Sequence, residues 1–186
     1  IEGDVLIFLP GVYDIRRTVE KLRKVSRLKG FQVFPLYGDL SPADQDRALT
    51  KSESRKIVVS PNVAETSLTI DGVRIVIASG LARIARFDRS RGINTLRIEK
   101  ISQYSARQRA GRAGRTSPGI CYRLWSENDH AGREMDLMPE ILRLELSEVL
   151  LLLLVAGIDP EADLNWIDSP TKESLSVSFA MLAGLG

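Results

Sequence analysis

The chain has 186 residues, 44% of them hydrophobic, and 26 basic against 24 acidic residues leave a formal net charge of +2 at pH 7. This composition excludes a disordered chain, and the length fits one large domain or an ordinary domain with a fragment of another. The single cysteine, Cys121, excludes a disulfide framework, and one histidine, His130, leaves little material for a metal centre, so we expect no metal site here.

Hydropathy and the chain ends limit the cellular setting. The longest apolar run, residues 149–156, is far shorter than the ~20 residues that a membrane-spanning helix needs. No secretory signal is visible, so we expect a cytoplasmic protein without a membrane partner. The chain starts at Ile1 without a methionine and stops within a helical pattern. We therefore interpret it as a piece of a longer protein.

Short apolar runs alternate with helical segments in the first part of the chain. Strands are expected over residues 4–10, 31–37, 56–60 and 73–78. Nearly continuous apolar runs are typical of strands that are buried on both faces of a parallel sheet. Helices are expected from Val12 to Leu28, over residues 43–50 after an N-cap at Ser41, and over residues 62–67. The alternation predicts βαβ units and an α/β fold with a parallel sheet.

After these strands the pattern changes to a basic β-hairpin. Residues 82–87 and 94–101 flank the turn-rich segment 88–93, which predicts a hairpin standing out from the sheet. It carries Arg83, Arg86, Arg89, Arg91 and Arg97. These arginines either protect an exposed strand edge or contact nucleic acid, and the sequence leaves both alternatives open. A last strand is expected over residues 119–125.

The segment at residues 105–115 concentrates arginine and glycine. On a helix of 100° per residue, Gln108, Arg112 and Arg115 fall within an arc of about 60°, with three alanines opposite. Two interior glycines cost about 1 kcal/mol each in such a helix, and the neighbouring arginines repel each other. Because the guanidinium fork suits phosphate oxygens, we interpret this face as a phosphate sensor rather than as a solvated basic helix.

Past about residue 133 the alternation stops and helices follow one another. They are expected over residues 140–144 and 147–156 and from Thr171 onward. This shift predicts two domains, residues 1–134 and residues 135–186, the second a small, truncated helical domain. The leucines at 150–154 make the middle helix apolar all round, so we expect it to be buried.

Four segments together resemble, in order, the motifs of the second RecA-like domain of superfamily-two RNA helicases of the DEAH/RHA group. Residues 6–11 resemble motif IV, 37–45 the segment after it, 62–71 motif V, and 108–115 (QRAGRAGR) motif VI. Elements near Pro139 and Trp166 resemble the winged-helix region that follows, in a form most like the bacterial HrpB type. The resemblance covers essentially the whole chain. It implies a RecA-like parallel sheet flanked by helices, with a protruding β-hairpin and a partial winged-helix region.

The resemblance implies a catalytic role for motif VI. In such ATP-dependent enzymes ATP lies between two RecA-like domains, and this domain supplies the trans side. Arg112 and Arg115 would reach the γ-phosphate as arginine fingers, and Gln108 would orient the attacking water or hold the γ-phosphate. Arg109 lies off this stripe and is expected to be structural.

The resemblance also implies nucleotide contacts from motif V. Thr69 and Asp71 would contact the nucleotide, with Asp71 on the ribose, and Ser67 would sense the γ-phosphate. The ligands of Mg²⁺ belong to the first RecA-like domain of the full-length protein, which this chain lacks. Without a P-loop or a DEAH box, the fragment is expected to be inactive alone.

The RNA partner is implied by the same fold. Gly11, Ser41 and Asn62 would contact the backbone of single-stranded RNA, and the hairpin with Arg89 and Arg91 would act as a wedge or exit guide. For Ser41 the alternative role of helix N-cap is at least as well supported.

Three positions depart from the family pattern. Pro61 replaces a threonine that usually opens motif V, Ala78 replaces an aspartate at the end of the following strand, and Leu49 stands where many members stack an aromatic ring on adenine. These changes remove one expected RNA contact and weaken base selectivity, but they leave the arginines of motif VI in place.

Two other functions compete with the helicase interpretation. A Rossmann-type nucleotide-binding domain fails because no Gly-x-Gly-x-x-Gly motif follows the first strand. A non-catalytic nucleic-acid-binding module derived from the helicase fold stays open, and an upstream P-loop and DEAH box would distinguish the motor from it.

Overall fold

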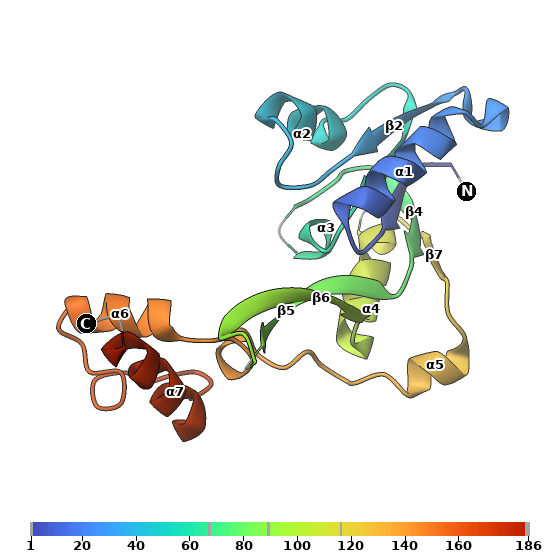
Figure 1. Cartoon of the computed structure of the whole chain (residues 1–186). Helices are drawn as coiled ribbons and strands as arrows, with labels where there is room; N and C mark the ends of the chain where they lie inside the picture. Colours follow the sequence, from blue (N-terminus) through green and yellow to red (C-terminus); the bar gives the residue numbers. More distant parts are fainter. Residues whose placement is uncertain (1, 67, 89, 116, 185–186) are drawn as a thin grey trace. The chain divides into compact units, whose positions relative to one another are not determined.

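The computed structural model describes residues 2–66, 68–88, 90–115 and 117–184 (Figure 1). The chain divides into two compact units. The first comprises Ile1–Arg83 with Ile98–Leu137, and the second comprises Ile84–Arg97 with Met138–Gly186. The tip of the hairpin therefore belongs with the C-terminal helices, an association that the sequence did not predict.

The first unit is built on a five-stranded parallel sheet. Its strands are β1 (Asp4–Phe8), β2 (Phe31–Pro35), β3 (Arg55–Ser60), β4 (Val73–Ala78) and β7 (Ile120–Arg123), in the spatial order β2-β3-β1-β4-β7. The register places Leu6 of the central strand between Val58 and Val76. The expected parallel sheet is confirmed, with all five predicted strands in it.

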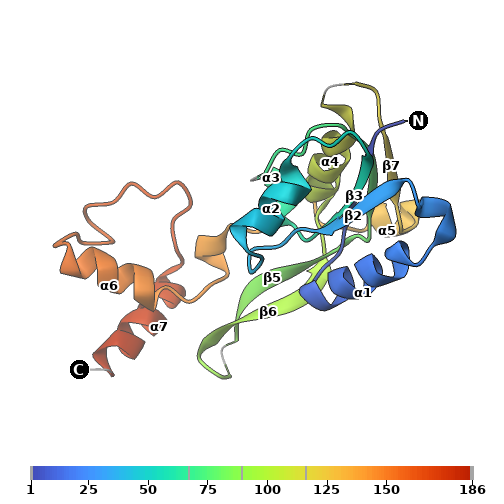
Figure 2. The same cartoon turned by 90° about the horizontal axis from the view of Figure 1, so that it is seen from above.

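Helices cover both faces of this sheet (Figure 2). They are α1 (Val12–Arg23), α2 (Pro42–Leu49), α3 (Val63–Thr66), α4 (Gln103–Gly111) and the 3₁₀ turn η2 (Arg112–Gly114), with α5 (Glu127–Ala131) after β7. Sequence analysis missed α5, although Ser126 caps it by accepting a hydrogen bond from the Asp129 amide. Five residues are too few to show a helical period.

The first helix ends earlier than its apolar spacing predicts. α1 stops at Arg23, Val25 is extended, and a separate 3₁₀ turn, η1 (Ser26–Leu28), follows. Val25 is 43% exposed, whereas Leu22 and Leu28 pack against the core. The apolar spacing therefore runs across a helix and a separate 3₁₀ turn, and Leu28 reaches the core from the turn.

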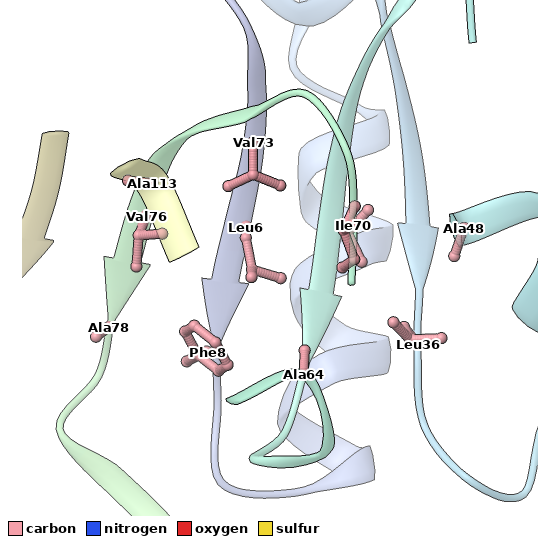
Figure 3. Close-up of a cluster of buried hydrophobic side chains, with 11 residues drawn as sticks. Leu6, Phe8, Leu36, Ala48, Ala64, Ile70, Val73, Val76, Ala78 and Ala113 are labelled. Carbon is pink, nitrogen blue, oxygen red and sulfur yellow. The ribbon is translucent and has the colours of Figure 1, made fainter. Parts of the chain in front are cut away.

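Alternate residues of each strand enter two separate cores. Leu6 and Phe8 of β1 join a cluster that includes Ala48 of α2, Ala64 of α3 and Ala113 of η2 (Figure 3). Val5 and Ile7 point the other way and pack with Ile15 and Val19 of α1. Because successive side chains of a strand face opposite sides, this double burial explains why the strands are apolar throughout.

The predicted hairpin is present as a separate two-stranded antiparallel sheet of β5 (Leu81–Asp88) and β6 (Ile93–Lys100). Its tip packs within the second unit, where the Phe87 amide donates to the Arg143 carbonyl at 3.0 Å. The Arg143 guanidinium donates to the Ala85 carbonyl, and the Glu145 amide donates to Asn94 Oδ1 at 3.0 Å. These contacts give the hairpin tip a defined attachment to the segment before α6.

The rest of the second unit is helical. η3 (Glu140–Leu142), α6 (Ser147–Val155) and α7 (Lys172–Ala183) follow one another, and Leu146, Leu150 and Leu175 form the core between α6 and α7. The expectation that α6 is buried all round is wrong. Leu150 is fully buried, but Leu152 is 65% and Val155 80% exposed. Within this unit one helix, α7, packs against α6 and covers only one stripe of it. In the part of the chain that the structure describes, no helix combines the length and apolarity needed to cross a bilayer.

Candidate functional site

Three arginines of α4, η2 and the residue after η2 converge on one short segment, residues 65–69. This segment follows β3, at the end of the sheet where parallel strands present their carboxyl ends. Clefts at this end of an open α/β sheet are the usual place for ligands. Each of the three arginines makes a different kind of contact with the segment.

Arg109 makes a buried ion pair. Its Nε donates to Glu65 Oε2 at 2.8 Å, its Nη1 donates to the Leu81 carbonyl at 3.2 Å, and its guanidinium lies 4.8 Å from the centre of the Phe8 ring. The side chain is 1% exposed. Burial lowers the pKa of Arg109, and the hydrogen bond and charge of Glu65 oppose this shift. A carboxylate, a carbonyl and an aromatic ring thus surround its guanidinium, and a structural role for Arg109 stays a prediction.

Arg112 holds main-chain oxygens. Its Nε donates to the Glu65 carbonyl at 2.7 Å, Nη2 donates to the same oxygen, and Nη1 donates to the Leu68 carbonyl at 2.7 Å. The residue is buried, and desolvation lowers its pKa, with a further lowering by the charge of Arg115. A guanidinium has five N–H groups, of which these contacts use three. These described contacts leave one N–H on Nη1 and one on Nη2 unused.

Arg115 is exposed, and its Nη1 donates to Thr69 Oγ1 at 2.7 Å. Gln108 is half-buried one turn before Arg112, and Asp71 is exposed two residues after Thr69. The structure thus brings Arg112 and Arg115 together with the loop that carries Thr69. Ser67 lies outside the described residues.

The single helix expected over residues 105–115 is wrong in its second half. The α-helix ends at Gly111 and the chain tightens into a 3₁₀ turn. Arg112 is buried and Arg115 is exposed, although the two guanidiniums stay close enough for the charge of Arg115 to lower the pKa of Arg112. In the part of the chain that the structure describes, a Cβ at Gly111 or Gly114 would meet no atom within 4 Å beyond its neighbours and its own helix backbone, so the surface beside the arginines is open.

The candidate RNA-contacting residues fall into two groups. Gly11, Ser41 and Asn62 follow β1, β2 and β3, which are neighbours in the sheet, so they share one end of it. Ser41 Oγ accepts from the Asp44 amide at 3.2 Å, which confirms its role as the N-cap of α2. Arg91 is exposed in the hairpin turn of the second unit, and Arg89 lies outside the described residues.

Gly11 is constrained by a neighbour that sequence reasoning did not identify. An added Cβ at Gly11 would lie 3.0 Å from Arg83 Nε. Arg83 was expected only as one of the hairpin arginines. Its side chain, which comes from β5, lies against Gly11 at the start of the loop after β1. A side chain at position 11 would have to displace it.

A second buried cluster fixes the base of the hairpin. Arg133 Nη1 donates to the carbonyls of Gly80 and Ile101 at 2.8 and 3.1 Å, and Nη2 donates to Asp129 Oδ2 at 2.7 Å. The guanidinium lies 4.4 Å from the centre of the Trp125 ring. Gly80 has a φ of 79°, and a Cβ there would lie 2.7 Å from both Arg133 and Trp125. Only glycine fits this junction.

Sequence reasoning missed Glu65 and Arg133. Glu65 was inside the motif V segment but was given no role, because its partner lies 44 residues further along the chain. Its position on a short helix among apolar residues was the available signal, since a buried carboxylate needs a partner. Arg133 carried a weaker signal, its spacing of four residues from Asp129, and no local pattern points to its two carbonyl acceptors on Gly80 and Ile101.

The chain matches a family model. Residues 1–117 fit the model described as "Helicase conserved C-terminal domain". The chain belongs to this family. Its five-stranded sheet and hairpin have the RecA-like architecture of solved HrpB structures, so the fold expected from the motifs is confirmed.

The similarity of this helicase domain to its relatives extends over almost the whole chain. The chain is 42% identical over 184 residues to the ATP-dependent RNA helicase HrpA of Escherichia coli, covering 99% of this chain and 14% of that protein. It is 42% identical over 188 residues to HrpB of the same organism, covering 99% of this chain and 23% of that protein. A crystal structure of the Escherichia coli DEAH/RHA helicase HrpB has a TM-score of 0.90 and 39% identity, covering all of this chain and 24% of that one. The predicted resemblance to DEAH-type RNA helicases is confirmed, and the chain spans less than a quarter of these relatives.

Proposed function

We propose that this chain is the second motor domain, residues 1–134, and the start of the winged-helix region, residues 135–186, of an ATP-dependent RNA helicase that acts in the cytoplasm. ATP and Mg²⁺ would be held chiefly by the first RecA-like domain of the same polypeptide. Relatives named as ATP-dependent RNA helicases support this function and do not favour a non-catalytic module.

The observation that carries the proposal is that Arg112 and Arg115 donate hydrogen bonds to the segment with Glu65, Leu68 and Thr69. Arg112 keeps two N–H groups and Arg115 keeps four that their described contacts do not use. Such donors fit the equatorial oxygens of a transferring γ-phosphoryl group, where negative charge spreads in the transition state. Arg112, held by main-chain oxygens, would supply a positive charge in a fixed place. The exposed side chain of Arg115 would be free to move its charge towards the phosphate.

The other proposed nucleotide contacts are those that the helicase motifs imply. Gln108 would orient the attacking water or hold the γ-phosphate. Thr69 and Asp71 would contact the nucleotide, with Asp71 on the ribose, and Ser67 would sense the γ-phosphate. The sequence has no P-loop lysine, so the chain alone would not hydrolyse ATP. Turnover by the purified 186-residue chain would contradict this point.

RNA would bind across the shared end of the sheet, with backbone contacts at Gly11, Ser41 and Asn62. Arg89 and Arg91 of the hairpin turn would contact the strand as it leaves the motor. Main-chain N–H groups and cations at these positions bind phosphate without selecting a base, so sequence-independent binding is expected.

The test is RNA-stimulated ATP hydrolysis by the full-length protein carrying Arg115→Ala. We expect a loss of about 10³-fold or more in kcat, as for other arginine fingers. Arg107→Ala is the matched control, because Arg107 is an exposed arginine of the same helix and its described contact is with the Tyr104 ring, 5.9 Å away. A loss of less than about tenfold for Arg115→Ala would contradict the proposed role.

A further inference from the structure

Glu65 holds two of the three arginines with different parts of one residue. Its carboxylate accepts from Arg109 Nε at 2.8 Å, and its main-chain carbonyl accepts from Arg112 Nε at 2.7 Å and from Arg112 Nη2. Only 8% of Glu65 is exposed. The position of its side chain therefore influences where its carbonyl points, and the carbonyl positions Arg112.

The helix that carries Glu65 is too short to fix that carbonyl by itself. α3 has four residues, and the Glu65 amide donates to the Asn62 carbonyl at 2.8 Å. A single helical turn is marginal in water without tertiary contacts. An external anchor for the segment is needed if its carbonyls are to keep one orientation.

Arg109 is suited to be this anchor. Besides Glu65 it contacts the Leu81 carbonyl at the start of β5 and the face of the Phe8 ring at the end of β1. It is thus fixed to the sheet and to the hairpin base as well as to its own helix. Its contacts tie Glu65 to the rigid part of the unit.

We propose that the Glu65–Arg109 ion pair is a positioning pair, which orients the Glu65 carbonyl and so holds Arg112, with the two N–H groups that its described contacts leave unused, in one conformation. This inference rests on the proposed function of Arg112. Neither Glu65 nor Arg109 touches the nucleotide. The pair acts through Arg112, whose conformation is set before ATP arrives.

The directional contacts support positioning more than stability. A buried ion pair can often be replaced by apolar residues of similar volume without loss of stability, so its presence is weak evidence for a stabilising role. Preorganised donors, in contrast, lower the barrier because they need no reorganisation during the reaction. An ion pair with one bonding geometry gives Arg112 such a preorganised position.

The test compares Glu65→Ala with Glu65→Gln in the full-length protein, in RNA-stimulated ATP hydrolysis. The alanine variant loses the anchor, and we expect kcat to fall about 100-fold, as for a small misplacement of a catalytic group. The KM for ATP and the affinities for ADP and RNA should change by less than about threefold. Binding of ADP with aluminium fluoride, which mimics the transition state, should weaken in proportion to kcat. Glutamine keeps an acceptor in the same place, so it should recover at least about tenfold of the lost kcat.

Two further variants separate positioning from folding. Arg109→Lys keeps the charge but loses the fork, so it tests the same anchor if Glu65→Ala does not fold. Ile15→Ala removes a fully buried side chain from the opposite face of the sheet. It should lower the melting temperature but leave kcat and the binding of the transition-state mimic unchanged at a temperature where the protein is folded.

The outcomes distinguish this inference from the proposed function. If Arg112→Ala abolishes turnover while Glu65→Ala and Arg109→Lys retain kcat within about threefold, the positioning role is wrong and the function stands. If Ile15→Ala lowers kcat as much as Glu65→Ala, the effect is one of stability and the positioning role is again wrong. If Arg112→Ala itself leaves turnover unchanged, the proposed function fails.

Discussion

Two helical segments of this protein reverse the usual relation between polarity and burial. In the segment formed by α4 and η2, Arg109 and Arg112 are among the most buried residues of the chain. In α6, whose residues are almost all apolar, Leu152 and Val155 are largely exposed. The two arginines are buried because their N–H groups donate hydrogen bonds to protein oxygens. Leu152 and Val155 are exposed because one helix, α7, covers a single stripe of α6.

The comparison teaches that partners, rather than side-chain polarity, decide burial at these positions. A buried cation is tolerated only when it is paired and hydrogen-bonded. An exposed leucine needs no compensation and is common on protein surfaces. The following experiments test each side of the comparison, beginning with the largest expected effect.

The buried cation of α4 should be costly to remove. Arg109→Leu would leave the Glu65 carboxylate buried without its partner, and we expect the free energy of unfolding to fall by about 3–5 kcal/mol. Chemical denaturation measures this change. Arg107→Leu, an exposed position two residues earlier, should cost about 0.5 kcal/mol or less. A loss below about 1 kcal/mol for Arg109→Leu would mean that the ion pair is not what keeps this arginine buried.

The two sides of α6 should differ in the same assay. Leu150→Ala opens a cavity between α6 and α7 and should destabilise the second unit by about 2–5 kcal/mol. Leu152 lies about half a helical turn after Leu150 and is 65% exposed, so Leu152→Ala should change stability by about 0.5 kcal/mol or less. Hydrogen exchange of α7 amides reads out this unit separately. Equal losses in the two variants would show that another surface covers Leu152.

Removing the N-cap of α2 should lower the stability less than the two core substitutions above. Ser41→Ala removes the N-cap of α2 and should cost about 1 kcal/mol, whereas Ser41→Thr keeps the hydroxyl and should cost less. The N-cap residue of α6, Leu146, offers no such signal, because its side chain makes no capping hydrogen bond. Measuring RNA affinity of the full-length protein with both variants separates the two roles of Ser41. Unchanged RNA affinity with lowered stability would leave the cap as its sole role.

The smallest effect is expected at the hairpin base and depends on pH. Hydrogen bonds from Lys100 and Arg133 hold the pKa of the Asp129 carboxyl below its ordinary value of 3.8. Because the folded pKa is the lower one, the contribution is present above the unfolded value and is lost as pH falls through the folded pKa. Asp129→Asn should therefore lower the melting temperature at pH 7, and its difference from the wild type should shrink as pH falls below 3.8 and through the folded pKa. A difference that is independent of pH would contradict this assignment.

The strands and most helices could be predicted because their signals are local. Leu6 and Ile7 belong to a continuous apolar run, Ser41-Pro42 begins a helix, and the glycine and arginine spacing of motif VI is contained in eight residues. The exposed side of α6 was not predictable, because apolar periodicity indicates which residues could be buried and not how many neighbours exist to cover them.

Local patterns were enough to predict the strands of the parallel sheet, the hairpin and the membership of the helicase family, because each strand, turn and motif lies within a short segment. Tertiary structure alone decided the different environments of Arg112 and Arg115, the pairing of Glu65 with Arg109, and the anchoring of the hairpin base by Arg133. These features depend on main-chain carbonyls and on residues more than 25 positions apart, as in the 44-residue separation of Glu65 and Arg109. Every residue carries the same main-chain carbonyl, so the direction in which a carbonyl points cannot be read from the identity of its residue.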